Sequence, residues 1–343
     1  MTYNQAMWLG AGATIIYTFL GGFLAVSWTD TLQASLMIFA LILTPVMVYL
    51  GLGGAEQMAA AMQGVAAETG KQYGSLLAGT TFVGIVSTAA WGLGYFGQPH
   101  ILVRFMAAAS VRHIPNARRI GMTWMVLCLG GAVAVGFVGI AYFAVSPAGA
   151  DAVNANAETV FMELAKQLFN PWIAGALLAA ILAAVMSTLS CQLLVCSSAL
   201  TEDIYRTFLR KQASQKELVW FGRAMVLVVA LIAISIARNP ESRVLGMVSY
   251  AWAGFGAAFG PVIILSLFCS RITRDGALAG IVTGAVTVLV WKQFGWFGLY
   301  EIVPGFILGW AATLGVSRLG RPSAAMLQTH ASVEQELARL QVH

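Results

Sequence analysis

Charged residues are scarce in this chain of 343 residues. Asp, Glu, Lys and Arg together make up only 10% of the sequence, whereas a soluble globular domain carries about 25%. Hydrophobic residues make up 59%, and the mean hydropathy is +0.79. This lack of charge excludes a soluble domain and indicates an integral membrane protein. The net charge of +5 is scattered over short loops and is too small to indicate nucleic-acid binding.

Cysteine is also rare. The four cysteines lie in or beside apolar segments, and no two have the spacing of a metal site: Cys128, Cys191, Cys196 and Cys269. We therefore expect neither a disulfide nor a zinc site.

Long apolar stretches are what the sequence has instead. Nine of them approach the ~17–25 residues that a membrane-spanning helix needs, at about residues 7–27, 32–52, 77–99, 120–146, 171–199, 219–237, 244–269, 276–294 and 299–317. We predict an all-α integral membrane protein with about nine transmembrane helices.

Basic residues fix the orientation of these spans. Fourteen of the 19 Lys and Arg residues follow the third, fifth, seventh and ninth spans, and the opposite side holds Lys71, Lys166, Arg238, Arg243 and Lys292. The positive-inside rule then predicts a cytoplasmic C-terminus and an external N-terminus. No charged leader precedes the first span, so we expect that an even number of spans is missing upstream.

The third stretch is interrupted by three glycines and a proline, in the sequence WGLGYFGQP at 91–99. Hydrocarbon offers no hydrogen-bond partner to the backbone groups that such a break leaves free. The break therefore predicts a protein-lined cavity, as in transporter binding sites. Trp91 and Tyr95 are four residues apart and would present two aromatic faces there, and Gln98 could add an amide. The alternative is that both aromatics are packing residues and the glycines allow close helix contact.

Polar residues within other spans have two interpretations each. Ser187 and Thr188 follow Ala184 by three and four positions, so their oxygens share one helix face and could hold a cation. The alternative is that both hydroxyls bond back to the carbonyl one turn earlier. Asp30 is favoured as the cap of the second span, and the alternative is a role in a gate or ion path.

Four blocks of sequence carry a family resemblance: residues 17–30 with Gln33, 91–100, 183–203 and 249–261. Together they resemble the sodium:solute symporter family. The resemblance covers nearly the whole chain but only about the last two-thirds of a family member, without its first four helices.

The resemblance implies a transporter fold of two inverted five-helix repeats. Residues 1–52 would end an incomplete first repeat, residues 77–269 would form the second, and residues 276–317 would be two extra helices. Residues 318–343 would be a cytoplasmic tail.

The resemblance also implies the site residues. Substrate would contact the broken segment through Trp91, Tyr95 and Pro99, with Gln98 beside them. Sodium would be held by Ala184, Ser187 and Thr188, and the remaining sodium ligands would lie on a helix upstream of Met1.

The implied function is sodium-coupled symport of L-proline into the cell by alternating access, in the bacterial inner membrane. We expect this chain to be an incomplete fragment that does not transport by itself. The alternatives are a symporter of another small solute and a non-transporting membrane fragment. An enzyme is disfavoured because no His or carboxylate lies beside Ser187 in the sequence.

Overall fold

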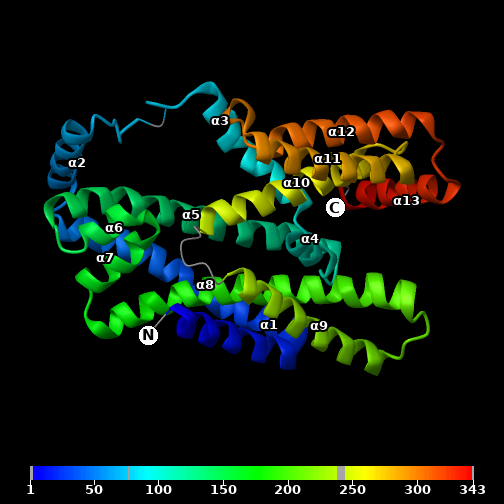
Figure 1. Cartoon of the computed structure of the whole chain (residues 1–343), viewed down its shortest axis with the longest axis horizontal. Helices are drawn as coiled ribbons and strands as arrows, with labels where there is room; N and C mark the ends of the chain where they lie inside the picture. Colours follow the sequence, from blue (N-terminus) through cyan, green and yellow to red (C-terminus); the bar gives the residue numbers. More distant parts are fainter. Residues whose placement is uncertain (1–2, 76, 238–243, 342–343) are drawn as a thin grey trace. The chain divides into compact units, whose positions relative to one another are not determined.

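The computed structural model describes residues 3–75, 77–237 and 244–341, which form helices joined by turns (Figure 1). Seven helical segments in these ranges are long and apolar enough to cross a membrane: Asn4–Gly51, Val111–Val145, Pro171–Leu209, Gln215–Ile236, Val244–Phe268, Arg274–Phe294 and Ile302–Leu319. The predicted all-α, multi-span architecture is therefore confirmed. Arg238 and Arg243, which entered the count of basic residues, lie outside the described residues, as do residues 342–343 of the predicted tail.

The first two predicted spans form one bent helix instead of two separate ones. Helix α1 covers Tyr3–Gly51 and has a single non-helical residue, Gly22, with φ 59° and ψ −152°. At 1.5 Å per residue, the 49 residues of α1 would extend about 73 Å, which is far more than the ~30 Å of a bilayer core. Residues 3–21 and 23–51 run in different directions in Figure 1, so the break lies at Gly22 and not near residue 30.

The third predicted span is shorter than expected. Residues 77–81 are not helical, and helix α3 covers only Phe82–Ala89 before a 3₁₀ segment, η1, covers Ala90–Gly97. A second short helix, α4, covers Pro99–Met106. The glycines and Pro99 account for the difference, because they interrupt the α-helical ladder before it reaches a spanning length.

The other predicted spans agree with the structure within a few residues. They are α5 (Ile114–Val145), α8 (Pro171–Ser198, continued by a π-helix over Ala199–Leu209), α9 (Gln215–Ile236), α10 (Val244–Phe268), α11 (Arg274–Phe294) and α12 (Ile302–Leu319). Local sequence explains where α8 begins. Asn170 caps it by accepting hydrogen bonds from the amides of Trp172 and Ile173, and Pro171 occupies its first turn.

The chain divides into two compact units. The first comprises Met1–Gly79 and Pro115–Pro240, and the second comprises Thr80–Ile114 and Glu241–His343. Both units contain parts of the segment 77–269, and the repeat boundaries remain a prediction. Within the first unit, α8 and α9 run antiparallel (Figure 1), and α1 packs along both of them.

The second unit is built on α10, α11 and α12, which pack through small residues. Gly284 of α11 lies so close to α10 that an added Cβ would be 2.2 Å from the carbonyl oxygen of Ala257. Close backbone approach of this kind is how helices associate where lipid supplies no hydrophobic driving force. Helix α13 (Ala324–Gln341) follows α12 and lies within the segment predicted as a tail.

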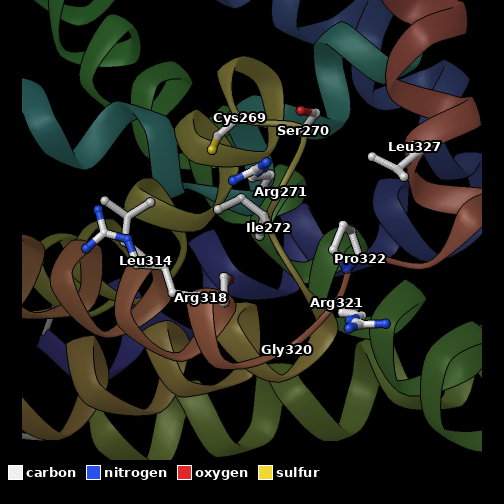
Figure 2. Close-up of a pocket in the computed structure, with 11 residues that line it drawn as sticks. Cys269, Ser270, Arg271, Ile272, Leu314, Arg318, Gly320, Arg321, Pro322 and Leu327 are labelled. Atoms are coloured by element: carbon white, nitrogen blue, oxygen red, sulfur yellow. The ribbon is translucent and has the colours of Figure 1, made fainter.

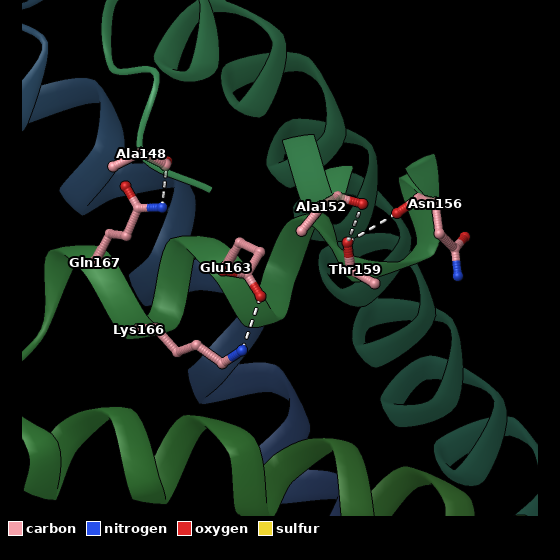
Figure 3. Close-up of polar contacts among 7 residues, drawn as sticks. All are labelled: Ala148, Ala152, Asn156, Thr159, Glu163, Lys166 and Gln167. Atoms are coloured by element: carbon pink, nitrogen blue, oxygen red, sulfur yellow. Dashed lines mark hydrogen bonds and ion pairs between the residues drawn. The ribbon is translucent and has the colours of Figure 1, made fainter. Parts of the chain in front are cut away.

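Short helices connect the spans of the first unit. They are α2 (Ala55–Thr69), α6 (Ala150–Ala155) and α7 (Val160–Leu168). Figure 3 shows polar contacts within and beside α6 and α7. Thr159 donates to the carbonyl of Asn156 at 2.8 Å, Lys166 pairs with Glu163 at 2.7 Å, and Gln167 donates to the carbonyl of Ala148.

Candidate functional site

The helix break predicted at residues 91–99 is present. The backbone changes from α-helix to 3₁₀-helix at Ala90, becomes extended at Gln98 (φ −81°, ψ 114°), and starts a new helix at Pro99. Proline suits this first helical position because it has no N–H to leave unbonded. The break therefore follows directly from the local sequence.

Aromatic rings from two helical segments and from the residues before α12 gather at this break. Trp91 stacks on Trp252 of α10, with ring centroids 5.4 Å apart and an interplanar angle of 15°, and on Tyr300, which precedes α12, at 6.3 Å and 17°. Tyr95 meets Trp252 edge to face at 4.8 Å and 85°. We call these four residues the aromatic cluster. Tyr95 remains 41% exposed and so presents ring surface that a small solute could contact.

Trp252 also binds the backbone of the break. Its indole Nε1 donates a hydrogen bond of 2.9 Å to the carbonyl oxygen of Trp91. Gly94 allows this contact, because an added Cβ there would lie only 1.9 Å from Trp252 Nε1. Sequence reasoning missed the contribution of Trp252, and its position in the block 249–261 was the only signal available.

Gln98 is anchored to the same tryptophan. Its side-chain Nε2 donates to the carbonyl oxygen of Trp252 at 3.1 Å, and the residue is only 3% exposed. Gly97 is buried as well, and an added Cβ there would lie 2.3 Å from the carbonyl oxygen of Phe255. For Gly94 and Gly97 the structure thus favours the alternative in which they serve close helix contact. Gln98 holds the broken segment against α10.

Tyr300 links the aromatic cluster to the rest of the second unit. Its hydroxyl donates to the carbonyl of Ser249 at 2.6 Å, and its backbone N–H donates to Ser87 Oγ at 3.0 Å. Burial, and secondarily the neighbouring Glu301 carboxylate, raise the pKa of Tyr300, so its hydroxyl stays a proton donor. Lys292 lies 3.3 Å from the Glu301 carboxylate. Sequence reasoning missed these residues too.

Three predicted oxygens come together on α8, in the first unit. Ser187 Oγ lies 3.3 Å and Thr188 Oγ1 lies 3.1 Å from the carbonyl oxygen of Ala184, and both hydroxyls donate to it. This is the back-bonded geometry of the alternative interpretation. The same geometry gathers three neutral oxygens on one helix face, and each hydroxyl oxygen keeps lone pairs that can face a cation. We call Ala184, Ser187 and Thr188 the oxygen cluster.

Helix α1 contacts α8 close to the oxygen cluster. The hydroxyl of Tyr17 donates to the carbonyl oxygen of Met186 at 2.9 Å, which lies between the two cluster positions Ala184 and Ser187 in sequence. This contact joins residues 169 positions apart. It fixes the N-terminal arm of α1 against the part of α8 that carries the predicted ion ligands.

The interpretation of Asp30 as a helix cap is wrong. Helix α1 continues through Asp30, and its break lies at Gly22 instead. Thr29, the residue before Asp30, donates its hydroxyl to the carbonyls of Ala25 and Val26, as a residue inside a helix does. The break lies at Gly22 because only glycine readily adopts the positive φ that the break requires. The alternative role in a gate or ion path stays a prediction.

A helix interrupted in mid-course, aromatic faces at the interruption and neutral oxygens on another apolar helix are the parts of an ion-coupled membrane transporter. The comparisons with known proteins agree with this class. The model of the sodium:solute symporter family matches residues 1–284, and the chain belongs to that family.

Two curated relatives are closely similar in sequence. The sodium/proline symporter of Escherichia coli (strain K12) is 67% identical over 335 residues, which cover 97% of this chain and 66% of the relative. The sodium/proline symporter of Salmonella typhimurium is 66% identical over 335 residues, with the same coverage of both chains. The chain therefore spans about two-thirds of the length of these relatives. Both are named as transporters and not as enzymes.

A solved structure shares the fold. It is described as a substrate-bound, outward-open state of a Na+-coupled sialic acid symporter, and it superposes with a TM-score of 0.74. The match covers 94% of this chain and 68% of that one at 19% sequence identity. This likeness establishes the transporter fold for the chain.

Proposed function

We propose that this chain carries the proline- and sodium-binding residues of a symporter that takes up L-proline with sodium by alternating access. The observation that carries the proposal is the aromatic cluster at the helix break, in a chain 67% identical to a protein named sodium/proline symporter. Sodium moving down its gradient would supply the free energy for proline accumulation.

Proline would bind at the broken segment. Its saturated ring would pack on the faces of Trp91 and Tyr95, which is worth about 0.5–1.5 kcal/mol beyond burial for aromatic contacts. Pro99 would set the direction of the chain as it leaves the break. Gln98 would act through Trp252, since its amide nitrogen already bonds to that residue.

Sodium would bind the oxygen cluster. Hard cations favour oxygen ligands. Ala184, Ser187 and Thr188 supply one carbonyl and two hydroxyl oxygens, and the hydroxyl oxygens lie 3.3 and 3.1 Å from the carbonyl oxygen. Three oxygens do not replace a full hydration shell, so further ligands are required. Asp30 would belong to the ion path. Placing a carboxylate within an apolar spanning helix costs free energy, and such residues commonly mark ion pathways.

We further propose a bacterial plasma membrane location with a cytoplasmic C-terminus. The chain has several spanning helices, and its relatives named above are bacterial. The excess of Lys and Arg after α4, α8, α10 and α12 supports the orientation. Labelling single cysteines introduced in α13 and α2 with an impermeant maleimide tests it. Modification of α13 in intact cells would reverse the assignment.

The transport proposal can be tested in a chimera. Since the chain matches 335 residues of the E. coli relative, these residues replace their counterparts in that relative, and the product is reconstituted into liposomes. An inward sodium gradient should drive uptake of labelled L-proline, and unlabelled L-proline should compete better than other small solutes. Sodium-driven uptake of a different solute with no response to proline would contradict the assigned substrate.

A further inference from the structure

A hollow of about 690 Å³ lies at one end of the second unit, where the ends of α10, α12 and α13 meet. Its walls come from the turn after α10 (269–272), from the last turns of α12 and from residues 320–322 before α13. Figure 2 shows the side chain of Arg271 in the middle of this group, with Arg318 and Arg321 on opposite sides of it. Three positive charges therefore line one concave surface.

These three charges are not compensated by the described part of the chain. None of Arg271, Arg318 and Arg321 forms an ion pair with a described carboxylate. Arg206 and Arg210, by contrast, pair with glutamates at 2.9 and 3.3 Å. Uncompensated guanidinium groups around a hollow repel one another and favour an anion, and their planar donors suit phosphate oxygens.

The surroundings of the hollow are apolar. Ile272 lines it and is only 5% exposed, and Leu314 lines it from α12. Phe268 and Leu319, the last residues of α10 and α12, are 82% and 89% exposed. An exposed apolar end of a spanning helix suits the level of a bilayer where hydrocarbon gives way to polar headgroups. A matching ligand carries a phosphate and hydrocarbon chains together.

We propose that this hollow binds the headgroup of an anionic phospholipid. The phosphate lies against Arg271, between Arg318 and Arg321, and the acyl chains run along Phe268 and Leu319. A dispersed attraction of basic loops to an anionic membrane also exists, but it gives no preference for one set of arginines. The proposed site requires these three arginines in particular, and this preference can be measured.

Lipid binding to the purified 343-residue chain is measured by native mass spectrometry, with phosphatidylglycerol or phosphatidylcholine added at equal concentrations. The test variant is Arg271→Gln/Arg318→Gln/Arg321→Gln. The matched control, Arg112→Gln/Arg118→Gln/Arg119→Gln, removes the same charge from arginines that do not line the hollow. Circular dichroism and gel filtration verify that each variant is folded.

The test variant should bind phosphatidylglycerol at least about tenfold more weakly than the control, because it also loses the charge-assisted hydrogen bonds from the three guanidinium groups to the phosphate, whereas the control loses only the dispersed attraction. Phosphatidylcholine binding should not change in either. The variant Arg271→Lys/Arg318→Lys/Arg321→Lys keeps the charge but loses the planar donors, so it should bind more weakly than wild type and more tightly than the Gln variant. Equal losses in test and control variants, or equal losses with Lys and Gln, would overturn the proposal.

A second measurement does not depend on the arginine variants. Cys269 lines the hollow, so in a chain whose other three cysteines are replaced by Ala, phosphatidylglycerol should slow its alkylation by a maleimide. Phosphatidylcholine should not. Equal protection by both lipids, or protection by inorganic phosphate alone at the same concentration, would show that no anionic lipid site exists there.

Discussion

The indole N–H of Trp252 donates a hydrogen bond of 2.9 Å to the carbonyl oxygen of Trp91, across 161 residues of sequence. The two rings also stack at 5.4 Å. One residue of α10 thus fixes both the ring of Trp91 and the backbone that carries it. Since Trp91 is a proposed proline contact, the geometry of the proposed substrate site depends on Trp252 as a positioning residue.

Replacing Trp252 by Phe should raise the proline concentration for half-maximal uptake by the chimera about two- to tenfold. The ring remains, but the Trp91 carbonyl loses its donor, and a hydrogen bond contributes about 0.5–1.5 kcal/mol net. Trp172→Phe is the control, because Trp172 is 89% exposed. Equal effects of the two substitutions would remove Trp252 from the account of the site.

The close approach at Gly94 should make it intolerant of even a methyl group. Gly94→Ala should lower the free energy of unfolding by about 1–3 kcal/mol, as overpacking does, because the new Cβ would lie 1.9 Å from Trp252 Nε1. Gly92→Ala, in the same 3₁₀ segment, should change the free energy of unfolding by less than about 0.5 kcal/mol. An added Cβ at Gly92 would have no neighbouring heavy atom within 4 Å. Thermal unfolding of the detergent-purified variants measures both, and indistinguishable midpoints would contradict the packing.

The anchoring of Gln98 predicts an effect on stability and on uptake together. Gln98→Glu replaces the donor to the Trp252 carbonyl by a carboxylate in a residue that is 3% exposed. The loss of that bond should lower the unfolding midpoint and weaken apparent proline affinity. The exposed Gln72→Glu changes charge identically and should leave both unchanged. A stable Gln98→Glu protein with altered uptake alone would instead favour direct contact of Gln98 with proline.

Much of the fold could be predicted from sequence, because spanning helices are encoded by local apolar length and the break at 91–99 by local glycines. The bend of α1 differs from the prediction because Thr29 satisfies its hydroxyl inside the helix, whereas Gly22 adopts the positive φ that bends it. The aromatic cluster could not be predicted completely. Trp252 lies on an apolar helix like any packing residue, and only tertiary structure brings it to Trp91.

The hydroxyls of the oxygen cluster can be tested against a matched threonine. Thr188→Val removes an oxygen that bonds back to Ala184 at 3.1 Å, and Thr287→Val removes one that bonds back to Thr283 at 2.7 Å on α11. We expect only the first to raise the sodium concentration for half-maximal uptake by the chimera, with Ser187→Ala behaving similarly. If both threonine substitutions leave the sodium dependence unchanged, Thr188 is only a back-bonded residue.

The dependence of proline affinity on sodium tests the central claim most directly. In proteoliposomes containing the chimera, the proline concentration for half-maximal uptake is determined at a series of external sodium concentrations, with choline keeping the ionic strength constant. If sodium and proline bind in one coupled cycle, higher sodium should lower this concentration, as reciprocal linkage between two ligands requires. Thr188→Val should shift the whole response to higher sodium. A half-maximal proline concentration that stays constant across the sodium series would contradict the proposed coupling.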